Sequence, residues 1–218
     1  MTAFLFAPVP GRDAGAATAC TKYASPAGSD TNSGSATAPF LTAQRLINNL
    51  STGQTGCLYS GSYVGNATFA LGGVNLASVP GNRAKLGGYI WVKSTANSVT
   101  ISDLDVDGHD VSPPTIQVHG DGVTLSGLNI TNRNKPGLAY NAMCVLAGSD
   151  FENNPANTAY GLVVRDNRIH DCGDDAHEHA IYLESTRGAI VQNSYLYANP
   201  GYGIHMYPDA RERRSSTT

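Results

Sequence analysis

Acidic and imidazole side chains are concentrated in one short stretch of the chain. The segment Asp174-Asp-Ala-His-Glu-His179 comes shortly after His170 and Asp171. Groups this close together shift one another's pKa values, which brings a carboxylate or an imidazole into the range for proton transfer near neutral pH. The stretch therefore predicts a site for general acid or general base chemistry.

The reaction that fits such a group is removal of the proton next to a uronate carboxylate. Polysaccharide lyases and C5-epimerases share this step, which needs a base beside a group that neutralises the carboxylate. The candidate groups for this step lie in the segment 174–179, and His179 is one of them. A hydrolase is the less favoured reaction type.

Metal binding is the alternative chemistry for the same residues. His177 and His179 are two residues apart and would share one face of a strand, with Asp175 close by. A second acidic series offers oxygen ligands that calcium prefers: Asp103, Asp105 and Asp107. A solvated loop and a solubilising acidic edge are the favoured interpretations of these two groups, so no metal ligand is assigned and calcium is only the possible ion. No phosphate loop, dinucleotide fingerprint or nucleophile elbow indicates another cofactor.

The elements that must position these residues follow from a repeat. Four segments carry apolar residues that alternate around a small or amide residue: 99–106, 123–130, 162–169 and 189–196. Their aligned residues Ile101, Leu125, Val164 and Val191 lie 24, 39 and 27 residues apart. Such spacing is typical of a solenoid in which each turn of chain stacks on the previous one.

A second family of strands lies between these segments, at 90–92, 116–118, 144–146, 181–183 and 204–206. The first and third residues of each triplet are expected to point inward, so the middle residue points outward. Neighbouring turns place such residues about 4.8 Å apart in columns. The first predicted column is Trp91, Gln117, Val145, Tyr182 and His205, and the second is Lys93, His119, Ala147, Glu184 and Tyr207.

These columns suit a sugar polymer, because rings stack on aromatic side chains and hydroxyl groups need donors and acceptors. We take Trp91, Gln117, His119, Tyr182, Glu184, His205 and Tyr207 as the substrate-binding candidates. Solvated strand positions with no ligand are the alternative interpretation, since any outward-facing strand carries polar residues. Two strand families per turn favour a right-handed parallel β-helix over a sandwich.

The ends of the chain differ from this middle part. Residues 1–19 are expected to be a leader or a disordered segment, and the apolar Phe4-Leu-Phe-Ala7 leaves a remnant of an export signal as an alternative. Residues 20–57 form the predicted cap of a β-helix domain that runs to 209, with a helix over 42–50 covering the first turn. A polar tail over 210–218 follows.

Composition narrows the partners. The chain has 218 residues, 24 of them glycine, and charged residues make up only 14% of it, which favours strands and turns. A net charge of −3 and a pI near 6.0 argue against nucleic acid. No apolar run reaches the roughly 20 residues that span a bilayer.

The four cysteines fit neither a redox motif nor a zinc site, because they lie 37, 87 and 28 residues apart. Disulfides are favoured: Cys20 with Cys57 would brace the cap, and Cys144 with Cys172 would tie neighbouring turns. Four reduced thiols in the core are the alternative. If the bridges form, the protein is secreted or lies on the cell surface.

Several motifs resemble the secreted bacterial right-handed parallel β-helix proteins of the pectin-lyase-like superfamily. They are Ala24-Ser-Pro-Ala-Gly-Ser-Asp30, Ala38-Pro-Phe-Leu-Thr42, Asn167-Arg-Ile-His-Asp-Cys-Gly173, His179-Ala-Ile-Tyr182 and Gly201-Tyr-Gly-Ile-His-Met-Tyr-Pro-Asp209. The resemblance implies an all-β solenoid with a short N-terminal capping helix. Since the family normally continues with further turns beyond the position of Asp209, it also implies a truncated chain whose open C-terminal turn associates end to end.

One motif resembles a narrower group. Asp175-Ala-His-Glu178 is similar to the Asp-Pro-His-Glu/Asp motif of mannuronan C5-epimerases, with Ala176 in place of proline and Cys172 in place of an upstream tyrosine. The resemblance implies catalytic roles for Asp175 and His177 and a role for Lys135. We therefore expect a secreted β-helix that acts on an acidic polysaccharide as a lyase or epimerase. A non-catalytic carbohydrate-binding or surface-structural protein is the alternative.

Overall fold

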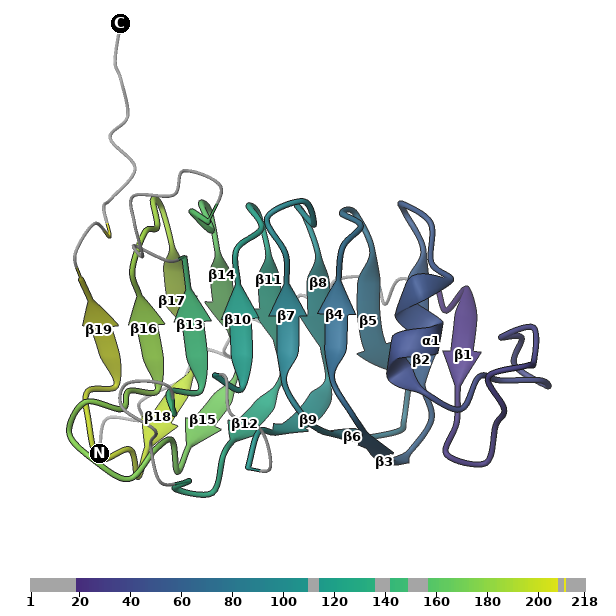
Figure 1. Cartoon of the computed structure of the whole chain (residues 1–218), viewed down its shortest axis with the longest axis horizontal. Helices are drawn as coiled ribbons and strands as arrows, with labels where there is room; N and C mark the ends of the chain where they lie inside the picture. The colour runs from purple at the N-terminus through teal and green to yellow at the C-terminus, as the bar shows by residue number, and fades with distance from the viewer. Residues whose placement is uncertain (1–18, 110–113, 136–141, 149–156, 208–209, 211–218) are drawn as a thin grey trace, which may run out of the picture.

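The chain winds into a stack of coils that each contribute one short strand to three parallel sheets. The computed structural model describes residues 19–109, 114–135, 142–148, 157–207 and 210, and within these residues there are 19 strands and one helix. The coils follow one another along the long axis from β1 at one end to β19 at the other (Figure 1). The all-β parallel solenoid expected from the repeat is confirmed.

Sheet A runs the length of the molecule. In sheet order its strands are β1 (Lys22–Ala24), β2 (Thr55–Leu58), β5 (Asn75–Ser78), β8 (Thr100–Ser102), β11 (Thr124–Ser126), β14 (Val163–Arg165) and β17 (Ile190–Gln192). Ile101, Leu125, Val164 and Val191 pair with one another across its last four strands. The alignment of the four repeats is therefore correct residue by residue.

Sheet B was not expected, because each eight-residue repeat was interpreted as one strand. It consists of β3 (Gly61–Val64), β6 (Ala84–Gly87), β9 (Leu104–Asp107), β12 (Asn129–Thr131), β15 (Arg168–His170) and β18 (Tyr195–Tyr197). The repeats bend between sheets A and B at residues with φ between 48° and 64°: Asp103, Gly127, Asp166 and Asn193. Left-handed backbone cannot continue a strand, so each coil has three strands rather than two.

Sheet C contains the second predicted strand family, preceded by one further strand. Its members are β4 (Ala67–Phe69), β7 (Ile90–Val92), β10 (Ile116–Val118), β13 (Val145–Ala147), β16 (Ile181–Leu183) and β19 (Ile204–Met206). The prediction is wrong by one residue at β13, where Val145 and Ala147 are buried and Leu146 takes the outward position. Cys144 is held in a disulfide just before the strand, which displaces the pattern by one residue.

The interior is a continuous apolar column that alternate residues of the strands fill. Sheet A supplies Leu76, Ile101, Leu125 and Val164, and sheet B supplies Leu86, Val106, Ile130 and Ile169. Sheet C supplies Phe69 and the first and third residues of β7, β10, β13 and β16. The strand period of two residues explains this division, since the intervening residues face solvent.

Asparagine side chains join adjacent coils at the corners. The buried Asn167 accepts from Leu128 N–H at 2.8 Å and donates to Leu125 C=O at 3.0 Å, both in the previous coil. Asn132 links Ala142 and Gly173 in the same way, and Asn199 links Ile169 and Cys172. Amide bridges form at these three positions, because backbone groups at a bend need side-chain partners. Asn193 differs: it is exposed and occupies a bend.

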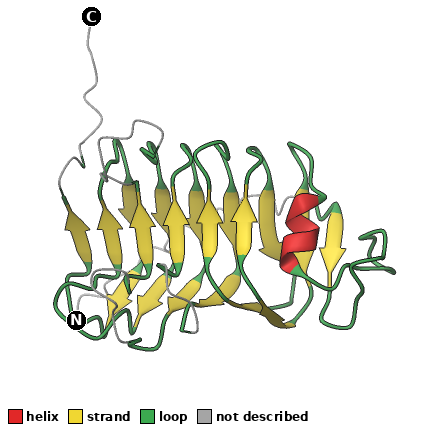
Figure 2. Cartoon of the chain, in the orientation of Figure 1, coloured by secondary structure: helices red, strands yellow, loops and turns green. Residues whose placement is uncertain are grey.

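The N-terminal end of the stack is covered. Helix α1 (Ala43–Asn48) begins after Thr42, whose side chain accepts from Arg45 N–H at 3.1 Å as an N-cap. It takes the place next to β4 that another strand of sheet C would occupy (Figures 1 and 2). Its buried residues Leu46 and Ile47 face the core, and a β carbon at Gly56 would come within 2.9 Å of Leu46. The predicted capping helix is confirmed.

The other end of the described stack is open. In β19, Ile204 and Met206 are 41% and 55% exposed, whereas their partners in β16, Ile181 and Leu183, are buried. Ile190 of β17 is also exposed at 49%. The free edges of β17, β18 and β19 lie together at this end (Figure 1), and Ile204 and Met206 add exposed apolar surface there.

Two disulfides join neighbouring coils. Cys20 is bonded to Cys57 and Cys144 to Cys172, which confirms both predicted pairs. No helix in the described ranges is long and apolar enough to cross a membrane. The predicted leader and polar tail lie outside the described residues, apart from residues 19 and 210.

Candidate functional site

The outward side chains of sheet C form the predicted first column, with one correction. Strand pairing aligns Thr68, Trp91, Gln117, Leu146, Tyr182 and His205 across β4, β7, β10, β13, β16 and β19. In the first column, Leu146 takes the place predicted for Val145. In the second column, Ala147 is buried, and Gly148, directly after β13, takes the place predicted for it. Two polar and aromatic clusters result, separated by the apolar β13.

Histidines and tyrosines make up the cluster on β16 and β19. The Tyr182 and His205 rings stack at 4.8 Å with an interplanar angle of 7°. His179 meets His205 edge to face at 4.4 Å and stacks on Tyr202 at 5.4 Å, and Tyr207 lies 6.4 Å beyond His205. Adjacent parallel strands place rings about 4.8 Å apart, so stacking follows directly from the register.

Hydrogen bonds fix the tautomers of the two histidines. The Tyr202 backbone N–H donates to His179 Nδ1 at 3.0 Å. A neutral imidazole has one donor and one acceptor nitrogen, so His179 carries its proton on Nε2 and donates it to His205 Nδ1 at 2.7 Å. His205 must then carry its own proton on Nε2. It therefore presents an N–H donor, and not a lone pair, on the face of sheet C.

His179 is held in the neutral state. Burial, followed by the charges of His205 and His177, lowers the pKa of His179 from 6.5 to about 4, with Asp175 acting in the opposite direction. The side chain is only 4% exposed, and protonating Nδ1 would remove the acceptor for Tyr202. The contacts of His179 place it behind His205, the residue that faces outward on β19.

Asp175 and His177 lie in the loop before β16 and reach solvent. Their side chains are 58% and 63% exposed. Asp175 Oδ1 accepts from the His177 backbone N–H at 2.7 Å and lies 3.4 Å from His177 Nδ1. A carboxylate beside Nδ1 favours a proton on that nitrogen, so Nε2 becomes the acceptor. His177 thus has the opposite tautomer preference to His205, and both lower the pKa of His179.

The cluster on β7 and β10 is smaller. Trp91 Nε1–H points to His119 Nδ1 at 3.5 Å, and the two rings meet edge to face. Because an indole N–H only donates, His119 carries its proton on Nε2, 3.1 Å from the Gln117 amide, whose oxygen is the end that fits this proton. Burial lowers the pKa of His119. The Lys93 ammonium lies over the Trp91 ring at 5.2 Å.

The remaining candidates occupy the edges of this face. Glu184 follows β16 directly and is half-buried, and its backbone N–H donates to Ala147 C=O. Lys135 lies in the turn after β12, where its backbone N–H donates to Asn132 C=O at 3.2 Å. Glu178, inside the titratable segment, is fully buried and accepts from Ala142 N–H at 2.6 Å. It supports the loop from within, whereas its neighbours Asp175 and His177 face out.

Two of the three aspartates considered for calcium are paired with cations instead. Asp105 pairs with Arg83 at 2.9 Å, and Asp107 pairs with Lys85 at 2.8 Å and Arg133 at 3.1 Å. Desolvation opposes ionisation of Asp107, but hydrogen bonds and the two cations prevail and lower its pKa. Asp103 lies at the bend between sheets A and B. Among the described residues, no three His, Cys, Asp or Glu side chains gather as a metal site.

Tyr202 was not among the predicted site residues. It lies between two glycines, one position outside the inward and outward alternation of β19, so strand periodicity carries no signal for it. Its contribution is its backbone N–H and a ring stacked on His179. Leu146 was missed because of the one-residue displacement at β13.

Comparison with known families agrees with this architecture. Residues 86–215 match the family model described as a right handed beta helix region. The chain belongs to the right-handed β-helix family. A search of curated proteins gave no match.

Two solved structures share the fold of this β-helix protein. Pectate lyase Pel9A superimposes with a TM-score of 0.67 over 93% of the chain at 14% identity, and a rhamnogalacturonan lyase with a TM-score of 0.58 over 92% at 14% identity. The β-helix chain spans 57% and 64% of the lengths of these two structures. Likeness at this identity concerns the fold.

Proposed function

We propose that the outer face of sheet C binds an acidic polysaccharide and that its β16–β19 end removes the proton next to a uronate carboxylate, as a lyase or C5-epimerase does. The pairing of opposite histidine tautomers carries this proposal. His177 offers a lone pair on Nε2 as the base, and His205 offers an N–H donor.

The two roles match the two needs of the reaction. Removing the proton leaves negative charge that spreads into the carboxylate, so a fixed donor at that carboxylate stabilises the transition state. His179 keeps this donor in place, because its own tautomer is fixed by Tyr202. Asp175 stabilises the His177 imidazolium that forms when the proton is taken up.

The rest of the face would hold the polymer. Tyr182, Tyr207 and Trp91 offer ring surfaces for sugar stacking, and Lys93 adds a cation beside Trp91 for a carboxylate. From β7 to β19 the strand spacing spans about 19 Å, which is room for several sugar units. The two solved neighbours are polysaccharide lyases by name, which supports the choice of ligand class.

Binding without turnover is the second candidate. The exposure of Asp175 and His177 favours it, because water surrounding an acid–base pair weakens its electrostatic effect. Under either function the disulfides fit an oxidising compartment, so we propose a secreted or cell-surface protein. We also propose that two copies associate through the open end formed by β17, β18 and β19, where apolar surface is exposed.

The test is an assay of the purified chain on alginate, pectate and glycosaminoglycans, with neutral glycans for comparison and with metal chelated or supplied. A lyase produces the ultraviolet absorbance of unsaturated uronates, and an epimerase changes the uronate ratio without cleavage. His177→Gln should reduce turnover by about 10²- to 10⁴-fold, as expected for loss of a general base. His205→Gln should weaken both binding and turnover.

His170→Gln is the matched control. His170 stacks on Tyr197 at 4.9 Å in the same ladder geometry as His205 on Tyr182, but it lies on sheet B. It should leave binding and turnover unchanged. Saturable retention on an acidic polymer without turnover would favour the binding function, and full activity of His177→Gln would remove this histidine from the mechanism. No binding to any acidic polymer would overturn both functions.

A further inference from the structure

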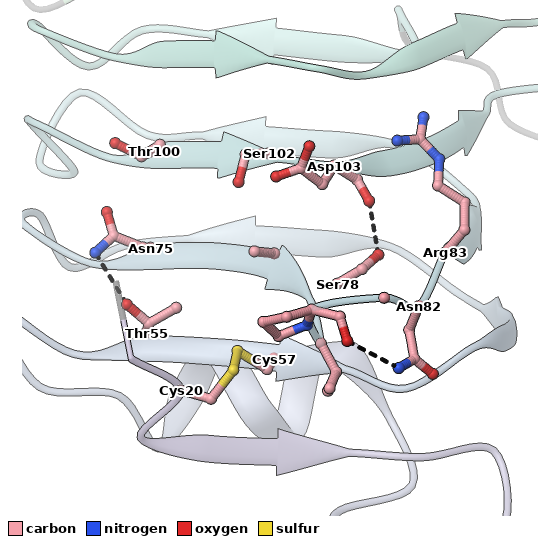
Figure 3. Close-up of a pocket in the computed structure, with 14 residues that line it drawn as sticks. Cys20, Thr55, Cys57, Asn75, Ser78, Asn82, Arg83, Thr100, Ser102 and Asp103 are labelled. Carbon is pink, nitrogen blue, oxygen red and sulfur yellow. Dashed lines mark hydrogen bonds between the residues drawn. A yellow bond between two sulfur atoms is a disulfide. The ribbon is translucent and has the colours of Figure 1, made fainter. Parts of the chain in front are cut away.

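A pocket lies on sheet A, on a different face of the coils from the histidine cluster. Its volume is about 450 Å³, within the range of small-molecule sites. The outward side chains of β2, β5 and β8 form its floor, and the segment 79–83, which connects β5 to β6, forms one wall (Figure 3). The Cys20–Cys57 disulfide closes the side towards the cap.

Polar groups converge in this pocket. Thr100 and Ser102 are half-buried on β8, and Asp103 follows them at the bend to sheet B. Among the hydrogen bonds and ion pairs of the described residues, none involves the Thr100 hydroxyl, the Ser102 hydroxyl or the Asp103 carboxylate. The backbone beneath them is fixed, since Asp103 N–H donates to Ser126 C=O at 3.0 Å and Asp103 C=O accepts from Ser78 Oγ at 2.6 Å.

The charge in the pocket is that of Asp103 alone. Arg83 also lines it, but its guanidinium donates to Asp105 Oδ1, Leu104 C=O and Gly127 C=O, each at 2.9 Å. Its positive charge is therefore matched by Asp105. Asp103 Oδ1 lies against Gly127, where a β carbon would approach it to 2.7 Å, so the carboxylate is held close to the glycine backbone.

Apolar surface completes the lining. Ala77, Val79 and Pro80 lie beside the disulfide, and Asn82 braces the wall by accepting from Ser60 N–H at 3.1 Å and Ser60 Oγ at 3.0 Å. Deeper in the pocket, Asn75 Nδ2 donates to the buried Thr55 Oγ1 at 3.2 Å. Hydroxyls, one carboxylate and a small apolar wall match a ligand with several hydroxyl groups and a C–H face.

We propose that this pocket binds a neutral sugar residue. The Asp103 carboxylate accepts from two sugar hydroxyls, the Thr100 and Ser102 hydroxyls donate to or accept from a third, and Val79 and Pro80 cover the C–H face. An acidic sugar is disfavoured, because its carboxylate would face Asp103 with no unmatched cation nearby. The pocket thus has the opposite charge preference to sheet C and does not depend on the function proposed there.

The test is an amide chemical-shift titration of the isotope-labelled full chain. The neutral probes are galactose, glucose, mannose and rhamnose, and galacturonate and glucuronate are the acidic counterparts of the first two. At least one neutral sugar should shift the amides of Thr100, Ser102 and Asn82 in a saturable way and bind more tightly than either acidic sugar. Asp103→Asn should weaken neutral binding by about tenfold, because charge-assisted hydrogen bonds are lost. It should also reduce the preference over the acidic counterpart.

The repeat supplies the controls. Thr124-Leu-Ser126 on β11 has the same sequence pattern and outward register as Thr100-Ile-Ser102 on β8, one coil away from the pocket. Thr100→Val and Ser102→Ala should weaken binding, whereas Thr124→Val and Ser126→Ala should not. The Asp103→Asn variant keeps the bend, because asparagine tolerates the left-handed backbone at this position, where φ is 56°. Absence of saturable shifts with all four neutral sugars would overturn the proposal, as would equal binding of acid and neutral sugar by the wild type.

Discussion

At the residue scale, the hydrogen bonds of His179 determine which nitrogen of His205 carries a proton, and this matters more for the site than the protonation of His179 itself. The chain from Tyr202 N–H through His179 to His205 allows only one proton arrangement. A histidine that faces solvent can serve as an acid or as a base. His205 is a donor here, because its Nδ1 accepts the proton of His179 and its own proton must lie on Nε2. The sequence pattern placed His205 in the outward column of its strand family, yet the tautomers depend on a backbone N–H that no side-chain pattern reveals.

The depressed pKa of His179 predicts acid sensitivity of the fold. Between pH 6.5 and about 4 the unfolded chain binds a proton on this histidine and the folded chain does not. Stability is therefore complete above pH 6.5 and falls as the pH is lowered, by up to about 3 kcal/mol in free energy of unfolding. Denaturant titrations across this range should show the slope.

His179→Gln should flatten part of this slope, because a glutamine amide can still accept from Tyr202 and donate to His205 without titrating. Burial also lowers the pKa of His119, so this histidine adds a slope of the same sign below pH 6.5 and His119→Gln is the companion variant. An unchanged slope in both variants would mean that other groups cause the acid sensitivity.

At the scale of elements, α1 closes the edge of sheet C with a side chain. Gln44 accepts from Thr68 N–H at 2.7 Å and donates to Thr68 C=O at 3.1 Å, so it satisfies β4 in the way a neighbouring strand would. An unprotected edge strand is a site for pairing with another chain. The short helix thus packs against the core and also covers the edge of sheet C at β4.

Gln44→Ala should therefore lower the free energy of unfolding by about 1 to 2 kcal/mol, as expected when hydrogen bonds at a strand edge are lost. Alanine has the higher helix propensity, so α1 itself gains slightly and cannot explain a loss. Thermal unfolding measures the effect, and Asn48→Ala, which keeps both bonds to Thr68, is the control. Equal stability of Gln44→Ala and wild type would show that the edge needs no cover.

Sequence predicted the strands better than the bends between them. Alternation placed the inward residues of sheet A and, except at β13, those of sheet C. The bends at Asp103 and Asp166 were not predicted, because in the sequence an aspartate with left-handed backbone looks the same as a polar strand residue. The slip at β13 arose because Cys144 and Val145 are both buried, so alternation alone cannot choose between two registers.

At the scale of the whole molecule, the two ends are not equivalent. α1 and β1 cover the first coil, whereas Ile204, Met206 and Ile190 expose apolar surface on the last described one. Because the helix covers the first coil, we expect the proposed association to join two open ends related by a two-fold axis.

Sedimentation should accordingly show a dimer that forms as the concentration rises. Met206→Lys places a charge in the contact and should keep the protein monomeric. Val64→Lys is the control, because Val64 is 90% exposed on β3 at the opposite end of the stack. A monomer at every concentration, or equal loss of the dimer in both variants, would contradict this arrangement.

The covalent link between Cys144 and Cys172 gives unfolding of this solenoid a direction and a stopping point. In a stack whose coils contact only their neighbours, opening starts where a coil has one neighbour and no cover. Among the described coils, that place is the coil of β17, β18 and β19, which carries Tyr202 and His205. Opening that runs inward from it meets the disulfide at the next two coils. The histidine pair therefore links the first coil that opens, which carries His205, to the coil beneath it, which carries His179. A molecule bound at the open end would oppose this opening and would thereby also stabilise the face that carries the two histidines.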